Sequence, residues 1–273
     1  MYIQVNGTKT YVYTGGQVPD AGKPTVVFIH GVLNDHSVWI LQSRYLAHHG
    51  FNVLAVDLPG HGKSAGNCPR SVEAAAAFVV NLLDAAGIEK AALVGHSWGS
   101  LIALHAASLL AKRATHVALL ATAFPMKVSP ALLEAALHGP MDAIHMVNTF
   151  SHSTLCPPPS ALGPGTWVYG ASHALMRRVL QSNPTENVFH IGFSACNDYL
   201  QAFEAIAQVN AEKLALLFIV GQHDQMTPPK AAQGLISAAL QATVVTVNAG
   251  HSLMTEAPDA TLAALHQFLK TSA

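Results

Sequence analysis

One stretch of the chain decides its fold: Leu93-Val94-Gly95-His96-Ser97-Trp98-Gly99-Ser100. It has the pattern G-x-S-x-G and stands between an expected strand, Ala91–Val94, and an expected helix, Ser97–Ala111. In that context the pattern predicts a sharp, strained turn that exposes a serine hydroxyl at the end of a sheet. Glycine on either side of the turn lets strand and helix approach closely, because no Cβ intervenes. The motif therefore predicts Ser97 as a nucleophile.

Outward from this motif, strands and helices alternate along most of the chain. The first fourteen residues alternate in polarity around Asn6-Gly7, which predicts an antiparallel hairpin. Short runs that are apolar on both faces predict parallel strands covered by helices; they are Thr25–Ile29, Asn52–Val56, Ala91–Val94, His116–Leu120, Leu214–Val220 and Thr243–Val247. Helical patterns lie at Ser37–His48, Ser71–Ala86, Ser97–Ala111, Pro229–Leu240 and Pro258–Lys270. The alternation predicts an α/β fold with a doubly wound sheet.

The alternation stops between about Pro125 and Val209, where helical patterns occur without a convincing strand. This segment also holds Pro157-Pro158-Pro159 and the turn Gly163-Pro164-Gly165. An insertion of that length with its own helices predicts a lid. We expect a core domain made of residues 1–124 and 210–273 and a helical cap made of residues 125–209. The alternative is a second helical layer with no role in substrate binding.

A nucleophilic serine needs a base, and the base needs an acid that orients it. His251 follows the last expected strand, and Asp224 follows the strand before it, so both leave the edge where ligands collect in such sheets. We therefore predict Ser97, Asp224 and His251 as catalytic residues. His96 and His223 are rivals, but side chains adjacent at such turns usually diverge. Asp57 is expected to fix the turns that follow it.

Two backbone N–H groups should stabilise the oxyanion of a tetrahedral intermediate. We expect them at Trp98, which follows the nucleophile, and at Val32, in the loop after Thr25–Ile29. His30 is expected to brace that loop. The substrate-binding residues that we expect are His36, Trp167 and Met226, although His36 alternatively caps a helix. Arg177 and Arg178 either hold a substrate carboxylate or form a solvated helix face.

Composition excludes several classes of function. The net charge is −1 with no basic cluster, so nucleic-acid binding is not expected. The apolar runs are too short to span a membrane, and the N-terminus has no signal-peptide pattern. Sixteen histidines occur without HExxH, and the chain has no CxxC motif, so no metal is expected. The cysteines are Cys68, Cys156 and Cys196, which fits a reducing cytoplasm. Charged residues are only 11%, which leaves a subunit interface, and hence a homo-oligomer, open.

On these residues the chain resembles the α/β-hydrolase superfamily over nearly its full length. The matching stretches are His30-Gly31, Asp57–Gly62, Gly95–Gly99, Gly221–Pro228 and Gly250-His251. Within it, the chain is similar to the branch of esterases, cofactor-free haloperoxidases and meta-cleavage-product hydrolases. The resemblance implies a mostly parallel eight-stranded sheet with helices on both faces, a helical cap and no cofactor. Two features depart from the pattern: Glu212-Lys213-Leu214 stands where many relatives have a proline, and Ser97 stands where dehalogenases and epoxide hydrolases have aspartate.

The residues and the resemblance together predict a serine hydrolase of small molecules. We expect it to cleave a small to medium hydrophobic ester, thioester or lactone through an acyl-enzyme. Two alternatives stay open. One is hydrolysis of a C–C bond in a meta-cleavage-type diketone, and the other is a non-catalytic, receptor-like protein that binds a ligand.

Overall fold

A single sheet runs through the protein. The computed structural model describes residues 1–154 and 167–271, and these form eight strands in the order β1-β2-β4-β3-β5-β6-β7-β8. Strands β3 to β8 pair in parallel, and β2 joins β4 in the antiparallel sense. The strands are β1 (Tyr2–Val5), β2 (Thr8–Tyr13), β3 (Thr25–Ile29), β4 (Asn52–Val56), β5 (Ala91–His96), β6 (Ala114–Leu120), β7 (Ala215–Gly221) and β8 (Ala242–Val247). The predicted α/β fold with a mostly parallel sheet is confirmed.

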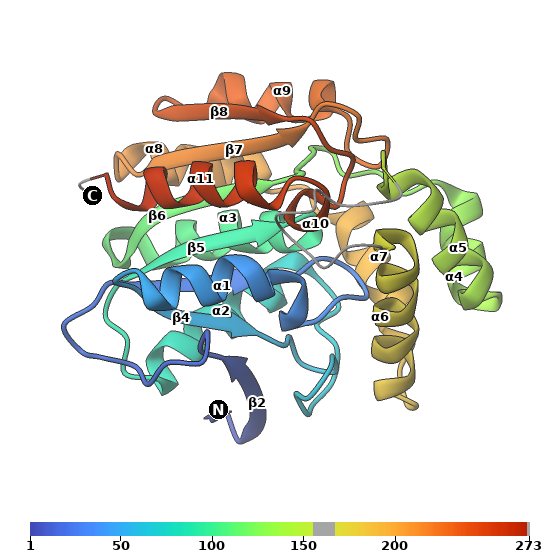
Figure 1. Cartoon of the computed structure of the whole chain (residues 1–273), viewed down its shortest axis with the longest axis horizontal. Helices are drawn as coiled ribbons and strands as arrows, with labels where there is room; N and C mark the ends of the chain where they lie inside the picture. The colour runs from blue at the N-terminus through green and yellow to red at the C-terminus, as the bar shows by residue number, and fades with distance from the viewer. Residues whose placement is uncertain (155–166, 272–273) are drawn as a thin grey trace.

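Helices cover both faces of the sheet (Figure 1). One face carries α1 (Ile40–His48) and α11 (Pro258–Leu269). The opposite face carries α2 (Val72–Ala85), α3 (Trp98–Leu110), α8 (Ala202–Ala211) and α9 (Pro229–Ala238). In β3, Val26 and Phe28 enter one apolar cluster while Val27 and Ile29 enter the other, because successive strand residues point to opposite faces. The two clusters are the core that holds the strand ends in place.

Local sequence accounts for several boundaries. Asn6 and Gly7 both have positive φ, as the tight turn of the predicted hairpin requires. Ser71 caps α2 by accepting a hydrogen bond from the amide of Ala74. The helix expected at Ser37–His48 is instead a 3₁₀ turn, η1 (His36–Trp39), followed by α1. The side chain of Asp35 caps that turn.

The segment expected as an insertion supplies four helices beside the sheet: α4 (Pro130–His138), α5 (Pro140–Ser151), α6 (Val168–Ser182) and α7 (Val188–Asp198). They lie at the end toward which the parallel strands point (Figure 1). Its last helix, α8, packs against α3 and α9, on a face of the sheet. Cys156, Pro157-Pro158-Pro159 and Gly163-Pro164-Gly165 lie outside the described residues.

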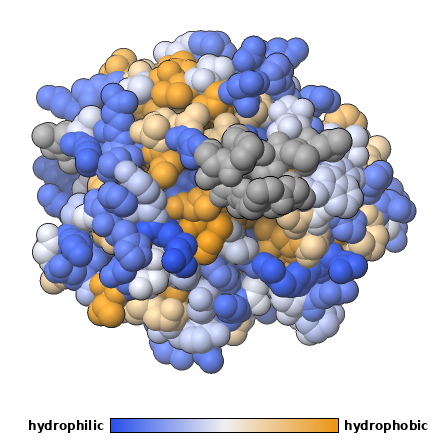
Figure 2. Space-filling view, viewed as in Figure 1, coloured by the Kyte–Doolittle hydropathy of each residue, from blue (hydrophilic) through white to orange (hydrophobic). Residues whose placement is uncertain are grey.

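The surface seen in Figure 2 is mostly hydrophilic, with apolar side chains gathered near the middle of that face. Across residues 1–154 and 167–271, no helix combines the length and apolarity that crossing a bilayer requires.

Candidate active site

Ser97 lies at the turn between β5 and α3, with φ 54° and ψ −122°. This is the strained backbone that the G-x-S-x-G pattern predicts, and it lifts the side chain away from the sheet. The turn is possible because its glycines have no side chain. A Cβ at Gly95 would lie 2.0 Å from the carbonyl oxygen of Gly99, which is too close for any other residue. A Cβ at Gly99 would lie 2.3 Å from the carbonyl oxygen of Ile29. The helix therefore reaches the strand only because both positions lack a side chain.

Asp224 and His251 leave the ends of β7 and β8, two neighbouring strands. His251 Nδ1 lies 2.9 Å from Asp224 Oδ2, and both side chains are buried. The other oxygen, Oδ1, accepts the amides of Met226 and Thr227, each at 2.8 Å. Burial alone would raise the pKa of Asp224, but His251 and the hydrogen bonds hold that pKa below its usual value. An ionised Asp224 can therefore hold the proton of the imidazole on Nδ1 and leave Nε2 as the basic atom.

Thr227 belongs to this group, although no separate role was expected for it. Its hydroxyl lies 2.7 Å from Asp224 Oδ2, 3.0 Å from the carbonyl oxygen of Ala121 and 3.2 Å from His251 Nδ1. It thus ties the acid and the base to the end of β6. The only sequence signal was its place three residues after the acid.

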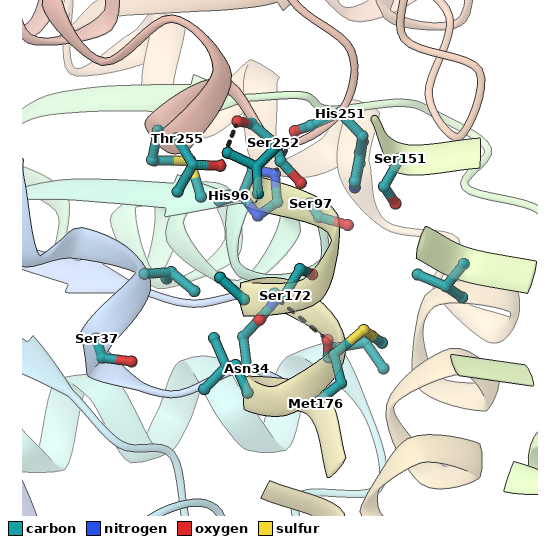
Figure 3. A pocket seen from close by; sticks show the side chains of 18 of the residues that line it. Asn34, Ser37, His96, Ser97, Ser151, Ser172, Met176, His251, Ser252 and Thr255 are labelled. Atoms are coloured by element: carbon teal, nitrogen blue, oxygen red, sulfur yellow. Dashed lines mark hydrogen bonds between the residues drawn. The ribbon is translucent and has the colours of Figure 1, made fainter. Parts of the chain in front are cut away.

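Ser97 and His251 open onto the same two cavities. Figure 3 shows both side chains at the wall of the larger one. Within the described residues, the Ser97 hydroxyl makes no hydrogen bond to the imidazole. Such contacts are often long without substrate and tighten in the reacting complex.

The two amides expected to hold an oxyanion face the same region. Val32 lines the larger cavity, and a Cβ on the preceding Gly31 would lie 3.2 Å from Ser97 Cβ, so this loop passes directly beside the nucleophile. Trp98 is the first residue of α3, where an amide has no partner inside the helix. Neither amide donates to an acceptor within residues 1–154 and 167–271. As far as the described residues go, both amides can therefore bind a substrate oxygen.

Two buried histidines support the site, and one of them, His96, also lines the larger cavity. His30 lies with Nδ1 2.8 Å from the carbonyl oxygen of Gly31, and its Nε2 accepts the amide of Leu58 at 3.1 Å, so it braces the loop as expected. His96 Nε2 donates to the carbonyl oxygen of His251 at 2.8 Å. Burial, together with the neighbouring His251, lowers the pKa of His96 to about 3. The other rival, His223, bonds Asn248 at the surface.

Of the three expected substrate-binding residues, the structure places one, Met226, in the wall of the cavities. Met226 lines both cavities. His36 does not line either cavity; its Nδ1 lies 2.7 Å from Asp57 Oδ1, and its ring packs against Tyr11. Trp167 is 57% exposed and stacks on Tyr169. The patterns that suggested His36 and Trp167 could not show which way each side chain points.

Asp35, His36 and Asp57 form a cluster whose ligand atoms lie within 4.8 Å of one another. The protein already supplies donors to it: Arg178 bonds Asp35 Oδ2 at 2.7 Å, and Lys63 donates its amide to Asp57 Oδ2 at 2.9 Å. The cluster therefore fixes turns and ties α6 to the loop after β3 through the ion pair of Arg178 and Asp35. Asp57 takes the structural role expected for it.

A second buried carboxylate near the base was missed in the sequence. Glu256, in the short helix α10 (Leu253–Glu256), accepts the amide of Gly250 at 3.1 Å through Oε1. Its Oε2 accepts the amide and hydroxyl of Ser153, both at 2.7 Å, and the amide of Thr154 at 3.1 Å. In addition, the amide of His251 donates to the carbonyl oxygen of Ser151 at 2.8 Å. These bonds attach the end of α5 to the loop that carries the base.

Comparison with known proteins agrees with this architecture. Residues 26–265 match the Alpha/beta hydrolase family. The chain belongs to this family. Among solved structures, the enol-lactonase of Burkholderia xenovorans superposes with a TM-score of 0.81 at 24% identity, covering 99% of this chain and 100% of the other. An esterase from Exiguobacterium antarcticum gives a TM-score of 0.82 at 18% identity, covering 99% of each chain. At these identities the likeness concerns the fold.

Curated relatives match over shorter stretches. Epoxide hydrolase A of Mycobacterium tuberculosis is 36% identical over 123 residues, which cover 43% of this chain and 37% of that protein. The dihydrolipoyllysine-residue acetyltransferase component of the acetoin cleaving system of Cupriavidus necator is 38% identical over 120 residues. That match covers 43% of this chain and 30% of the relative. The matches thus span about a third of each relative, and the relatives differ in activity.

Proposed function

We propose that this α/β hydrolase is a serine hydrolase that cleaves a small to medium hydrophobic ester, thioester or lactone through an acyl-enzyme. One observation carries the proposal. His251, hydrogen-bonded to Asp224, opens onto the cavity wall that also presents Ser97 on a strained turn and the amide of Val32, which has no acceptor within residues 1–154 and 167–271. This combination supplies a nucleophile, a base and an oxyanion donor at one place.

The reaction begins with attack of the Ser97 hydroxyl on an acyl carbonyl. His251 Nε2 takes the hydroxyl proton, while Asp224 holds the other ring nitrogen in its protonated form. The amides of Val32 and Trp98 receive the negative charge that develops on the carbonyl oxygen. His251 then gives its proton to the leaving group, and the acyl group stays on Ser97.

Water completes the cycle. His251 takes a proton from a water molecule, the resulting hydroxide attacks the acyl carbonyl, and Ser97 leaves as the alcohol. The two half-reactions use the same base in the same position. In this proposal, α4 to α7 act as a cap that shapes the substrate cavities above the strand ends.

The nature of the nucleophile separates this proposal from epoxide hydrolysis, the activity named for several relatives. The members of the superfamily that open epoxides are expected to carry aspartate at the position of Ser97. A serine hydroxyl attacks the carbonyl carbon of an acyl group and expels its alcohol or thiol, and water then hydrolyses the acyl ester, which suits esters, thioesters and lactones.

A fluorophosphonate probe tests the proposal directly. We expect the probe to add its mass to the wild-type protein and not to Ser97→Ala, and we expect wild type alone to hydrolyse p-nitrophenyl butyrate. A ring-cleavage dienoate assayed in parallel reports C–C hydrolysis. Absence of labelling in both proteins would refute the serine mechanism and favour a ligand-binding protein.

A further inference from the structure

The residue before the proposed nucleophile is a buried histidine, His96, that the proposed mechanism does not use. His96 is the last residue of β5 and is 3% exposed. Its ring lies between the loop after β3 and the loop of the base: a Cβ on Gly31 would lie 3.1 Å from Nδ1, and the ring centroid of His251 lies 4.8 Å from that of His96. Figure 3 shows His96 beside Ser97 at the wall of the larger cavity. The ring is therefore confined on two sides by parts of the proposed site.

A hydrogen bond joins this ring to the backbone of the base. His96 Nε2 lies 2.8 Å from the carbonyl oxygen of His251, although 155 positions separate the two residues in the chain. A carbonyl oxygen can only accept, so Nε2 carries the hydrogen and Nδ1 of the neutral ring carries none. Burial, together with the nearby His251, lowers the pKa of His96 to about 3, so the ring stays neutral near neutral pH. A neutral ring donates this hydrogen bond without placing a positive charge beside the imidazole that must take a proton.

The backbone of His251 is held from two directions. Its carbonyl oxygen accepts the bond from His96, at the end of β5. Its amide donates to the carbonyl oxygen of Ser151, at the end of α5, at 2.8 Å. The preceding amide, that of Gly250, donates to Glu256 Oε1 at 3.1 Å. Removal of the bond from His96 therefore frees one side of this loop, while the other bonds still hold its remaining parts.

The bond from His96 differs from the others because it connects the base to the nucleophile. Ser97 follows His96 in the chain, so a peptide bond attaches the nucleophile to His96 and a hydrogen bond attaches the base to it. Asp224 fixes the tautomer of the imidazole but comes from the end of β7, on another part of the sheet. The approach of the imidazole to the Ser97 hydroxyl therefore depends on where the backbone of His251 is held. A misplacement of about 1 Å between reacting groups can cost about 10²-fold in rate.

We propose that His96 is a positioning residue, whose hydrogen bond to the carbonyl oxygen of His251 sets the distance between the imidazole and the Ser97 hydroxyl. The inference rests on the proposed serine hydrolase function, because it takes His251 as the base. His96 acts through the base, and its Nε2 faces the backbone of His251. Loss of this bond therefore slows proton transfer more than it weakens substrate binding.

Two substitutions separate the hydrogen bond from the ring. His96→Phe keeps an aromatic ring and lacks the donor, whereas His96→Gln lacks the ring and carries an amide N–H that can reach the place of Nε2. We expect His96→Phe to lower kcat for p-nitrophenyl butyrate about 30-fold, with KM changed less than about threefold, because the lost bond positions the base. Labelling of Ser97 by the fluorophosphonate probe should slow in parallel. We expect His96→Gln to recover at least about a third of wild-type kcat, since it restores the donor.

His116→Phe is the matched control. His116 is a buried histidine of β6, with Nε2 3.1 Å from the carbonyl oxygen of Thr271 and its ring against Phe268. It lines neither cavity and lies near the start of its strand, whereas the site lies at the strand ends. We expect His116→Phe and His96→Phe to lower the midpoint of urea unfolding to a similar degree, but His116→Phe to keep kcat within about twofold of wild type. Should His96→Phe not fold, His96→Met replaces it, because methionine adapts its shape and has no N–H donor.

The outcomes distinguish the two proposals. A folded His96→Phe protein with kcat within about threefold of wild type, or a His96→Gln protein no more active than His96→Phe, would overturn the positioning role. Equal losses of kcat in His96→Phe and His116→Phe would overturn it as well, because they would show an effect of stability alone. In each of these cases labelling of Ser97 in the wild type leaves the hydrolase intact. If the wild-type protein is neither labelled nor active on esters, the proposed function itself fails, and the positioning role fails with it.

Discussion

Replacement of Asp224 by asparagine isolates the role of the acid in this site. The two oxygens of Asp224 have different partners: Oδ1 accepts two backbone amides at 2.8 Å, and Oδ2 faces His251 Nδ1 at 2.9 Å. An asparagine keeps its oxygen at the Oδ1 position, because an NH₂ group there would oppose two donors at about 1–3 kcal/mol each. The NH₂ group of Asp224→Asn therefore faces the imidazole.

That arrangement changes the tautomer of the base. With a donor opposite, Nδ1 of His251 must accept a hydrogen bond, so the ring proton moves to Nε2 and the ring can no longer take the proton of Ser97. A wrong tautomer of this kind lowers kcat about 10⁴-fold, which corresponds to about 5 kcal/mol of transition-state stabilisation. We expect a loss of this size in p-nitrophenyl butyrate hydrolysis and a parallel loss in the rate of fluorophosphonate labelling.

Asp57→Asn provides the matched control. Asp57 is also a buried carboxylate after a strand, and its Oδ2 accepts the amide of Lys63, but its contacts fix turns and do not face the base. We expect Asp57→Asn to keep kcat within about tenfold of wild type, and near-ultraviolet circular dichroism should show both variants folded. A folded Asp224→Asn protein that retains more than a tenth of wild-type kcat would refute the assignment.

Three further predictions concern stability. Glu256→Gln keeps its oxygen toward the three donors at the Oε2 position, so its NH₂ group opposes the amide of Gly250. We expect urea unfolding to show a loss of about 1–3 kcal/mol together with reduced kcat, and a loss under about 0.5 kcal/mol would contradict the proposed structural role. Gly99→Ala directs a Cβ to within 2.3 Å of the carbonyl oxygen of Ile29, and we expect a loss of about 3 kcal/mol with slower probe labelling. The exposed control Gly22→Ala, at a position without positive φ, should change little. Burial lowers the pKa of both His61 and His96 from 6.5 to about 3, so the unfolded chain binds protons that the folded chain does not. The unfolding free energy should therefore fall as the pH drops from 6.5 toward 3, by up to about 1.4 kcal/mol per pH unit for each histidine, and less steeply in His61→Phe; a flat profile would contradict this.

The sheet was predictable because its signals are local. Each parallel strand is a short apolar run, and the bounds of β3 and β4 agree with the sequence prediction residue by residue. The strained backbone of Ser97 followed from two glycines and the strand–helix context alone. The carboxyl ends of parallel strands share one edge, so the positions of Asp224 and His251 beyond β7 and β8 could also be predicted from the sequence. Their catalytic roles stay a prediction.

The directions in which side chains point could not be predicted from the sequence in the same way. His36 follows a loop that does line the larger cavity, yet its ring turns toward Asp57 because that carboxylate accepts both its Nδ1–H and its backbone amide. Trp167 begins α6 with its ring on Tyr169. Three of the four donors to Glu256 come from Ser153 and Thr154, about a hundred positions earlier in the chain, so no local pattern could indicate them. Contacts between distant segments decide these cases.

Two buried carboxylates lie near His251, and their partners explain why only one can serve the base. Glu256 receives four hydrogen bonds, three of them from backbone amides, and each of its oxygens is occupied by donors outside the imidazole. Asp224 receives two amides on one oxygen and leaves the other for His251 Nδ1 and Thr227. A carboxylate whose bonds are all made to fixed amides positions a loop, whereas one that shares an oxygen with an imidazole responds when the ring gains a proton. The different roles of the two carboxylates thus follow from the hydrogen-bond donors around each of their oxygens.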